Sequence, residues 1–334
     1  MDKQVRWGIM STAIIAREAV IPAMLKEPYR QSAVITAIAS RELAKAQATA
    51  ERFGIPQAYG SYEELLADEQ VDAVYIPLPN HLHVPYAIQS LEAGKHVLCE
   101  KPIGLSVAEA EELVEAGRRH PQLRLMEAFM YRHHPQWQWA RQVIGEGRIG
   151  TLRTIHSFFS YYDVDPHSIH NHVEWGGGGL MDIGCYPISL SRFLFQDEPR
   201  RVVGILEHDP KFRVDTLTSG IMEFAAGTAT FTCSTQLTDY QRIIAYGTKG
   251  RVEIEIPFNA PAEQPCRATL EVEGAVEDVE FDICDQYGIQ ADLFSRAILD
   301  DTPVPTPIED AVANMRVIEA IVRSGREQNW VELA

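Results

Sequence analysis

The sequence lacks several features that would place it in a specialised class of protein. Its five cysteines are odd in number and widely spread, so neither a disulfide framework nor a metal site of closely spaced cysteines is expected. No apolar stretch approaches the roughly 20 residues that span a bilayer. Met1 leads through Lys3 and Gln4 directly into an apolar run, which is not the pattern of a signal peptide. We therefore expect a cytoplasmic protein with reduced thiols and no membrane partner.

Positive charge is also scarce. Thirty Lys and Arg residues are outnumbered by forty-seven Asp and Glu residues, which gives a net charge of −17 at pH 7. Such a surface repels nucleic acid, so no nucleic-acid partner is expected, and local groups must hold any phosphate-bearing ligand. The 334 residues exceed the size at which a single core stops growing, so two domains are expected.

Short apolar runs alternate with helical segments from residue 5 to about 128. This order is typical of a parallel sheet with crossover helices. Two helical segments begin with Ser61-x-x-Glu64 and Ser106-x-x-Glu109, which have the form of capping boxes. We predict an α/β domain over residues 1–128. Its expected strands cover 5–10, 33–39, 73–77, 96–99 and 124–128.

The sequence changes after about residue 150 to alternating runs rich in Thr and aromatic residues. Tight turns with glycine, such as Ala226-Gly227, join several of them and favour a largely antiparallel sheet. A last helix is expected to begin near Thr306, with Pro307 at its first position. We predict an α+β domain over residues 129–334. Its expected strands cover 151–162, 201–206, 217–224, 228–235, 242–246, 251–256, 268–272 and 279–283.

A candidate nucleotide-binding turn follows the first strand, in Gly8-Ile9-Met10-Ser11-Thr12-Ala13. Backbone N–H groups and a helix N-terminus at such a turn can bind a pyrophosphate. Only the first glycine of Gly-x-Gly-x-x-Gly is present, but Ser11 and Ala13 are small enough for close approach, and Ser11 or Thr12 can add a hydroxyl donor. A turn of this kind also occurs for packing alone.

The end of the second strand, Ala39-Ser40-Arg41, bears on the choice of dinucleotide. A site for NAD usually carries Asp or Glu there to bind the ribose 2′-hydroxyl, whereas the 2′-phosphate of NADP needs cations and hydroxyl donors. Arg41 can hold a phosphate bidentately, so NADP is favoured and NAD remains an alternative. Glu42 follows directly, and Arg41 as a solvated residue at a helix start is the competing interpretation.

A second candidate site follows the apolar run 96–99, where Glu100, Lys101 and Pro102 stand. Open α/β sheets bind ligands beyond the carboxyl ends of their strands, so Lys101 is expected to point at a ligand. A solvated surface lysine is the alternative.

Three motifs together resemble the glucose-fructose oxidoreductase, inositol dehydrogenase and rhizopine catabolism (Gfo/Idh/MocA) family. They are Pro77-Leu78-Pro79-Asn80-x-x-His83, the run 93–102 and the glycine-rich stretch 176–187. Ser11-Thr12-Ala13, the stretch 127–132 and Tyr186 are similar to the branch that holds NADP-dependent D-xylose 1-dehydrogenases, dimeric dihydrodiol dehydrogenases and glucose-fructose oxidoreductase. The resemblance implies a Rossmann domain over 1–128 and a substrate-binding domain over 129–334. It also implies a homodimer or dimer of dimers, formed through the large open sheet of the second domain.

The resemblance also implies roles for individual residues. Lys101 would lie beside the nicotinamide, Asn80 and His83 near the cofactor, and Leu78 would contact it mainly by its backbone. Asp182 and Tyr186 would face the substrate, and a separation of four residues on a helix puts them on one face. Pro187 is expected to distort that helix near Ile183. The complete predicted cofactor set is Gly8, Ser11, Thr12, Ala13, Ser40, Arg41, Leu78, Asn80, His83, Glu100 and Lys101.

The predicted reaction is hydride transfer between NADP and C1 of an aldose such as D-xylose, which gives the lactone, with Lys101, Tyr186 and Asp182 as catalytic residues. Tyrosine titrates near pH 10, so as a base it needs a cation within roughly 4–6 Å, which lowers its pKa by about 1–3. Lys101 is the expected cation, and Asp182 would accept a hydrogen bond from a neighbouring substrate hydroxyl. Two alternatives stay open: a trans-1,2-dihydrodiol dehydrogenase or sugar or keto-sugar reductase, and a non-catalytic NADP sensor.

Other polar and aromatic residues allow two interpretations each. One predicted loop contains His167, His170 and His172, at spacings unlike those of a helical metal-binding motif, so we expect no metal. This loop either lines the substrate site or is solvated. In one interpretation Arg132 contacts the substrate or the nicotinamide. In the other it forms a salt bridge at the hinge between the domains. Trp175 either covers the apolar face of a sugar or belongs to the core.

Overall fold

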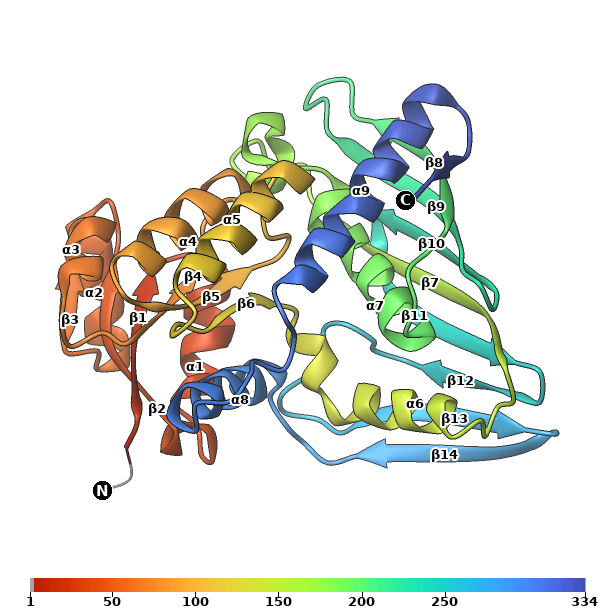
Figure 1. The fold of residues 1–334 in the computed structure, drawn as a ribbon, viewed down its shortest axis with the longest axis horizontal. Coiled ribbons are helices and arrows are strands. Elements are labelled where there is room, and N and C mark those ends of the chain that lie inside the picture. Colours follow the sequence, from red (N-terminus) through yellow and green to blue (C-terminus); the bar gives the residue numbers. More distant parts are fainter. Residues whose placement is uncertain (1–2, 334) are drawn as a thin grey trace. The chain divides into compact units, whose positions relative to one another are not determined.

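The chain forms two compact units in the computed structural model, which describes residues 3–333 (Figure 1). The first comprises Met1–Met130 with Gln286–Val312, and the second Tyr131–Asp285 with Ala313–Ala334. Met1, Asp2 and Ala334 lie outside the described residues, and with them part of the N-terminal pattern used above. In the described range, no helix is long and apolar enough to cross a membrane.

The first unit contains a six-stranded parallel sheet with the strand order β3-β2-β1-β4-β5-β6. This is the Rossmann order, so the predicted fold is confirmed. Five strands lie where the sequence pattern places them, within one residue at either end. The strands are β1 (Val5–Met10), β2 (Ala33–Ala39), β3 (Gln57–Tyr59), β4 (Ala73–Ile76), β5 (His96–Glu100) and β6 (Leu125–Ala128).

Two of the covering helices begin at the predicted capping boxes. Ser61 and Ser106 accept hydrogen bonds from the N–H groups of Glu64 and Glu109, each at 3.2 Å, and so satisfy donors that the first helical turn leaves open. The helices of this sheet are α1 (Ile21–Met24), α2 (Leu43–Phe53), α3 (Tyr62–Ala67), α4 (His83–Glu92) and α5 (Val107–Arg119). In Figure 1, α4 and α5 lie side by side.

A segment from late in the chain completes the core of the first unit. Helix α8 (Gln286–Leu299) places Phe294 against Trp7, with ring centroids 5.5 Å apart, and Ser295 accepts a 3.0 Å hydrogen bond from the Trp7 indole. All three side chains are fully buried. Residues 286–312, which the sequence division assigns to the second domain, therefore cluster with the first unit because their apolar side packs on β1.

The second unit contains a nine-stranded sheet in the order β14-β13-β12-β11-β7-β10-β9-β8-β15. Its paired strands run antiparallel except β7 and β10, so the predicted mostly antiparallel sheet is confirmed. The strands are β7 (Leu152–Tyr162), β8 (Arg201–His208), β9 (Asp215–Glu223), β10 (Thr228–Ser234), β11 (Gln236–Gly247), β12 (Gly250–Ile254), β13 (Cys266–Val272), β14 (Ala275–Phe281) and β15 (Val331–Glu332).

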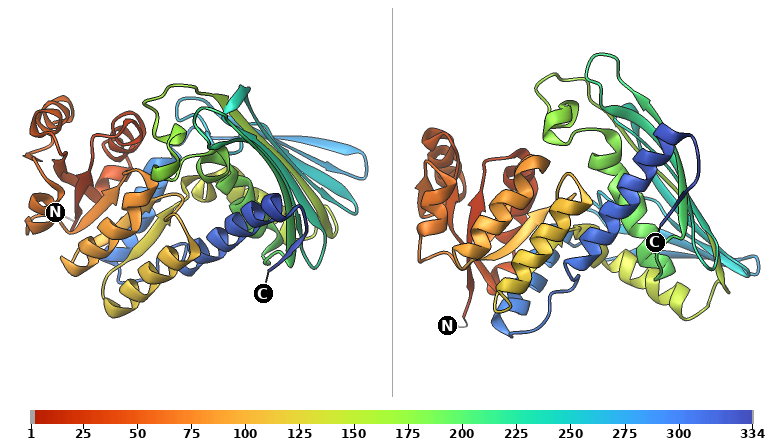
Figure 2. Two further views of the ribbon diagram at one scale, coloured as in Figure 1. Left: turned by 90° about the horizontal axis from the view of Figure 1, so that it is seen from above. Right: turned by 45° about the horizontal axis from the view of Figure 1, so that its top comes forward.

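Helices cover one face of this sheet, and Figure 2 shows the opposite face without a helix over it. The covering helices are α6 (Pro135–Gly145), α7 (Cys185–Phe195) and α9 (Glu309–Glu327). Helix α9 begins at Glu309, three residues after the predicted cap, and its first turn is closed by a 3.0 Å bond from the Asp310 N–H to the Pro307 carbonyl.

Candidate active site

The predicted site residues fall in both units, and each group is described within its own unit. At the carboxyl end of β1, Ser11 has a φ of 141°, and its hydroxyl accepts a 3.1 Å hydrogen bond from the Ala13 N–H. The chain then enters a helix, whose first bond runs from the Arg17 N–H to the Ala13 carbonyl. The turn therefore presents a helix N-terminus at the strand end, as pyrophosphate binding requires. The Thr12 carbonyl accepts a 2.9 Å hydrogen bond from the Arg17 side chain, which helps to hold the turn in place.

Gly8 serves packing in this structure. A Cβ there would lie 3.0 Å from both the Leu65 and the Val71 side chains, because α3 and the following loop press against β1 at this point. This accounts for the glycine without a ligand, and its predicted contact with the cofactor stays a prediction.

The end of β2 presents the cation Arg41, and the acidic residue that follows it is paired with a lysine. Arg41 is exposed, whereas Glu42 turns its carboxylate to Lys45 at 2.7 Å. Burial raises the pKa of the Tyr62 hydroxyl, and Arg41 and a hydrogen bond with Ser11 oppose that rise, so these three side chains lie close together. Tyr62 was missed in the sequence because its place in the first turn of α3 indicates only packing.

His83 joins the two loops that follow β4 and β5. Its imidazole is 1% exposed and lies 2.7 Å from the Leu78 carbonyl and 2.8 Å from the Pro102 carbonyl. Burial outweighs these two contacts and lowers the pKa of His83 to about 4, which favours the neutral ring. The side chain therefore links the Leu78 and Lys101 loops, and Asn80 on the first of them is half-buried.

Glu100 is held by hydrogen bonds to both carboxylate oxygens. The Tyr75 hydroxyl donates to Oε1 at 2.6 Å, and the Lys101 backbone N–H donates to Oε2 at 3.2 Å. Tyr75 is fully buried in the centre of the sheet, and the Lys101 side chain is half-buried at its edge. The carboxylate thus anchors the start of the lysine loop, and no sequence signal pointed to Tyr75 as its partner.

In the second unit, the glycine-rich stretch leads into an irregular helix that carries Asp182 and Tyr186. Residues Leu180–Gly184 form a π-helical turn, after which α7 begins at Cys185. This is where Pro187 was predicted to distort the helix, since its ring crowds the carbonyl of Ile183. Asp182 and Tyr186 are 8% and 5% exposed. The structure brings the two predicted polar side chains onto neighbouring turns.

Tyr186 lies among aromatic rings. Its ring centroid is 5.2 Å from Phe258 and 5.8 Å from both Tyr131 and Phe159. These contacts fix the ring plane, and apolar walls strengthen any electrostatic interaction of the phenol group. The polar partners of Asp182 include Tyr161 and His170, whose contact with it the sequence analysis did not predict.

The side chains of Arg132 and Trp175 both contact neighbouring residues of the second unit. The Arg132 guanidinium is 5% exposed and donates to the Ser189 hydroxyl at 2.7 Å. Trp175 is half-buried and stacks on His172 at a centroid distance of 3.9 Å. Their predicted contacts with substrate or cofactor remain predictions.

Metal and thiol chemistry find no support in the part of the chain that the structure describes. Residues 3–333 contain no group of three or more His, Cys, Asp or Glu side chains that could hold a metal ion. The five cysteines all lie in the described range and form no disulfide. Burial raises the pKa of Cys99 well above its ordinary value, which keeps it protonated and unreactive.

Each of the two parts of the chain matches the model of a known protein family. Residues 5–129 match the family described as "Oxidoreductase family, NAD-binding Rossmann fold", and residues 137–253 match the GFO/IDH/MocA C-terminal domain. A D-xylose 1-dehydrogenase (NADP(+)) of Haloferax volcanii is 37% identical over 98% of this chain and 99% of its own length. An uncharacterised oxidoreductase of Rhizobium meliloti is 44% identical over 98% of both chains.

Solved structures agree with these matches. A 3-ketoreductase from Actinomadura kijaniata in complex with NADP and TDP-benzene has a TM-score of 0.90 and 30% identity, and the alignment covers 96% of this chain and 98% of that chain. An aldose-aldose oxidoreductase from Caulobacter crescentus has a TM-score of 0.91 and 26% identity, with 99% and 100% covered. The chain therefore belongs to the Gfo/Idh/MocA family of NAD(P)-dependent oxidoreductases.

Proposed function

We propose that this protein oxidises C1 of an aldose such as D-xylose to the lactone, with NADP as the hydride acceptor. The observation that carries the proposal is the pair of buried polar side chains, Asp182 and Tyr186, on neighbouring turns of one helix. Ligand pockets place a few polar groups in otherwise apolar walls, so such a pair at the end of a glycine run favours a ligand-binding role. The NADP-dependent D-xylose 1-dehydrogenase among the relatives supports this substrate class.

The residues of the first unit fit a bound NADP. Ser11, Thr12 and Ala13 would hold the pyrophosphate at the helix start after β1, and Ser40 and Arg41 the 2′-phosphate. Glu42 is paired with Lys45, so its charge is partly neutralised beside Arg41. Leu78, Asn80, His83, Glu100 and Lys101 would form or support the nicotinamide end. When bound, NADP supplies the acceptor for the hydride.

Tyr186 is the proposed base, and Lys101 the cation that favours its phenolate form. The C1 hydroxyl transfers its proton to the Tyr186 oxygen, while the C1–H bond breaks with its electron pair leaving as hydride, and the C1=O bond of the lactone forms. Asp182 accepts a hydrogen bond from a neighbouring hydroxyl and orients the sugar. Arg132 and Trp175 are secondary candidates for substrate contact.

A panel of substrates tests the proposal. Pentoses, hexoses, inositols and dihydrodiols would be offered with NADP and with NAD, and reduction followed at 340 nm. We expect an aldose with NADP to give the highest kcat/KM. A preference for a trans-dihydrodiol, or turnover only in the reductive direction on a keto-sugar, would favour the activities named for a mouse relative and for an Actinomadura kijaniata relative. Tight NADP binding without turnover on any substrate would favour a sensor. A cytoplasmic location stays a prediction from the sequence.

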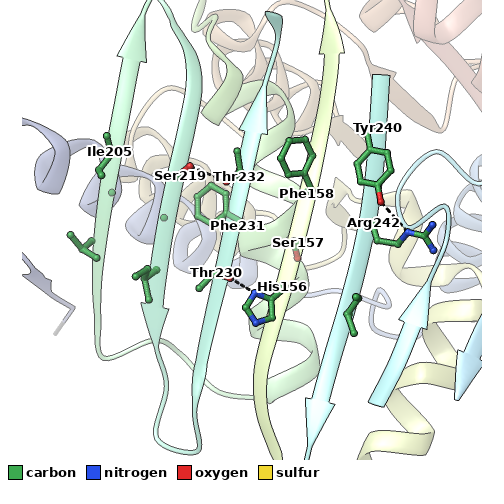
Figure 3. Close-up of a pocket in the computed structure, with 15 residues that line it drawn as sticks. His156, Ser157, Phe158, Ile205, Ser219, Thr230, Phe231, Thr232, Tyr240 and Arg242 are labelled. Atoms are coloured by element: carbon green, nitrogen blue, oxygen red, sulfur yellow. Dashed lines mark hydrogen bonds between the residues drawn. The ribbon is translucent and has the colours of Figure 1, made fainter. Parts of the chain in front are cut away.

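We also propose that the chain forms homodimers through the uncovered face of the nine-stranded sheet. Strands β7 to β11 line a shallow groove of about 550 Å³ on this face, with Phe158, Ile205 and Tyr240 among its side chains (Figure 3). Ile205 is 76% exposed and Tyr240 48%. An apolar patch of this kind on a sheet face is typical of a protein–protein interface.

Sedimentation velocity tests the dimer. Ile205→Asp places a charge in the patch, so we expect the main species to shift from dimer to monomer at micromolar concentration. Leu43→Asp, at an exposed apolar position of the first unit, is the matched control and should leave the dimer intact. A wild-type monomer, or a dimer that survives Ile205→Asp, would contradict this interface.

A further inference from the structure

The loop between β7 and the glycine-rich stretch is built into the second unit. The Gly178 N–H donates to the His170 carbonyl and the Gly177 N–H to the His172 carbonyl, both at 2.9 Å. The Asn171 side chain is 4% exposed and donates to the Asp165 carbonyl at 2.9 Å. These bonds hold His170 in one place, which a solvated loop would not do.

Gly177 is a glycine because this loop lies directly on it. A Cβ there would come within 2.4 Å of the His170 carbonyl oxygen and 2.8 Å of the His172 carbonyl oxygen. Both are backbone atoms, which cannot rotate away as a side chain could. The glycine-rich stretch therefore docks the histidine loop against the helix that carries Asp182.

Two side chains from different elements hold the Asp182 carboxylate. The Tyr161 hydroxyl, at the end of β7, donates to Oδ2 at 2.6 Å. The His170 Nδ1, on the loop, lies 3.4 Å from Oδ1. The Tyr161 and His170 rings meet edge to face with centroids 6.4 Å apart. Each carboxylate oxygen thus has its own partner, and the carboxylate plane is fixed from two sides.

We propose that Tyr161 and His170 are positioning residues that orient the Asp182 carboxylate toward a substrate hydroxyl next to the reacting carbon. The inference rests on the proposed function, because the hydroxyl in question is the C2 hydroxyl of an aldose. A carboxylate has about four acceptor positions, so Asp182 accepts from the sugar while Tyr161 and His170 hold it. A free rotamer would lose that alignment.

The nearby carboxylates have other partners. Glu174 lies 3.4 Å from His172, and Asp215 accepts from the Leu180 N–H at 2.7 Å. Asp182 is therefore the carboxylate that Tyr161 and His170 hold.

The test compares D-xylose with 2-deoxy-D-xylose, or the matching pair for the aldose that the panel selects. Wild-type kcat/KM should fall about tenfold for the deoxy sugar, the value of one charge-assisted hydrogen bond. Tyr161→Phe and His170→Ala should each raise the KM for the parent sugar about tenfold and leave the deoxy sugar nearly unchanged. The preference for the 2-hydroxyl then disappears, which a general loss of structure would not produce.

Two further variants separate positioning from folding. His170→Asn puts an amide N–H where Nδ1 stands, so it should restore the preference for the 2-hydroxyl. His167→Asn changes an exposed histidine of the same loop and should behave as wild type. If Tyr161→Phe or His170→Ala fails to fold, the other of these two variants gives the same comparison.

An active wild type whose preference for the 2-hydroxyl survives both Tyr161→Phe and His170→Ala would overturn this inference alone. A wild type that does not discriminate against the deoxy sugar would overturn it as well. A wild type that binds NADP but turns over no aldose would instead remove the proposed function, and this inference with it.

Discussion

The buried His83 imidazole predicts a specific loss of stability in mild acid. Burial lowers the pKa of His83 from 6.5 to about 4, although two backbone carbonyls lie within hydrogen-bond distance. Its folded pKa lies below its unfolded pKa, so the unfolded chain binds a proton at pH values where the folded chain does not. The contribution to stability is therefore present above pH 6.5 and is lost as the pH falls toward 4.

The size of this loss follows from the two pKa values. The interval between 6.5 and about 4 corresponds to about 3 kcal/mol for one histidine. The replacement His83→Asn keeps one hydrogen bond to the backbone and removes the titration. We expect the variant to be less stable than wild type at pH 8, and the difference between the two to shrink by about 3 kcal/mol between pH 7 and pH 4.

Urea unfolding at several pH values, followed by circular dichroism and tryptophan fluorescence, measures this difference. Burial also lowers the pKa to about 4 in three other histidines, but these titrate in both proteins and cancel: His96, His133 and His134. Parallel stability curves for wild type and His83→Asn would refute the reasoning. They would mean that the folded chain keeps His83 protonated, with one N–H donated to each carbonyl.

Three further changes have expected results. Ser106→Ala removes the cap of α5 and should cost about 1 kcal/mol in urea unfolding, which Ser106→Asp restores. Gly178→Ala should lower the thermal midpoint and the turnover together, because Gly178 has a φ of +115° and a Cβ there would lie 2.2 Å from Asp215 Oδ1; an unchanged midpoint would contradict the strain. Arg41→Ala should weaken NADP binding about tenfold or more and NAD binding little, as measured by fluorescence titration; an equal effect on both would exclude a 2′-phosphate contact.

Much of the first unit could be predicted because its signals are local. A run such as Ala73–Ile76 is buried on both faces, and a box such as Ser106-x-x-Glu109 acts within one turn. Strand β3 was missed, since Gln57–Tyr59 has only three residues and none is buried. The place of α8 was missed because only tertiary packing, Phe294 on Trp7, decides it.

The motif residues of the candidate site could be predicted from the sequence, whereas the residues that hold them in place could not. Lys101, Asp182 and Tyr186 stand in motifs that a resemblance can recognise. Their partners come from distant parts of the chain: Tyr75 is 25 residues from Glu100, and Tyr161 is 21 from Asp182. Contacts of that separation depend on strand register and loop path, which no local pattern encodes.

The central claim, that Tyr186 is the base of an NADP-dependent sugar oxidation, is tested most directly by the turnover of Tyr186→Phe on the aldose that the panel selects. This change removes one oxygen and keeps the ring among its aromatic neighbours. We expect kcat to fall by about 10²–10⁴-fold with the Kd for NADP within twofold of wild type. Tyr162→Phe, at a tyrosine 63% exposed, should leave kcat unchanged. A kcat for Tyr186→Phe close to that of wild type would contradict the account.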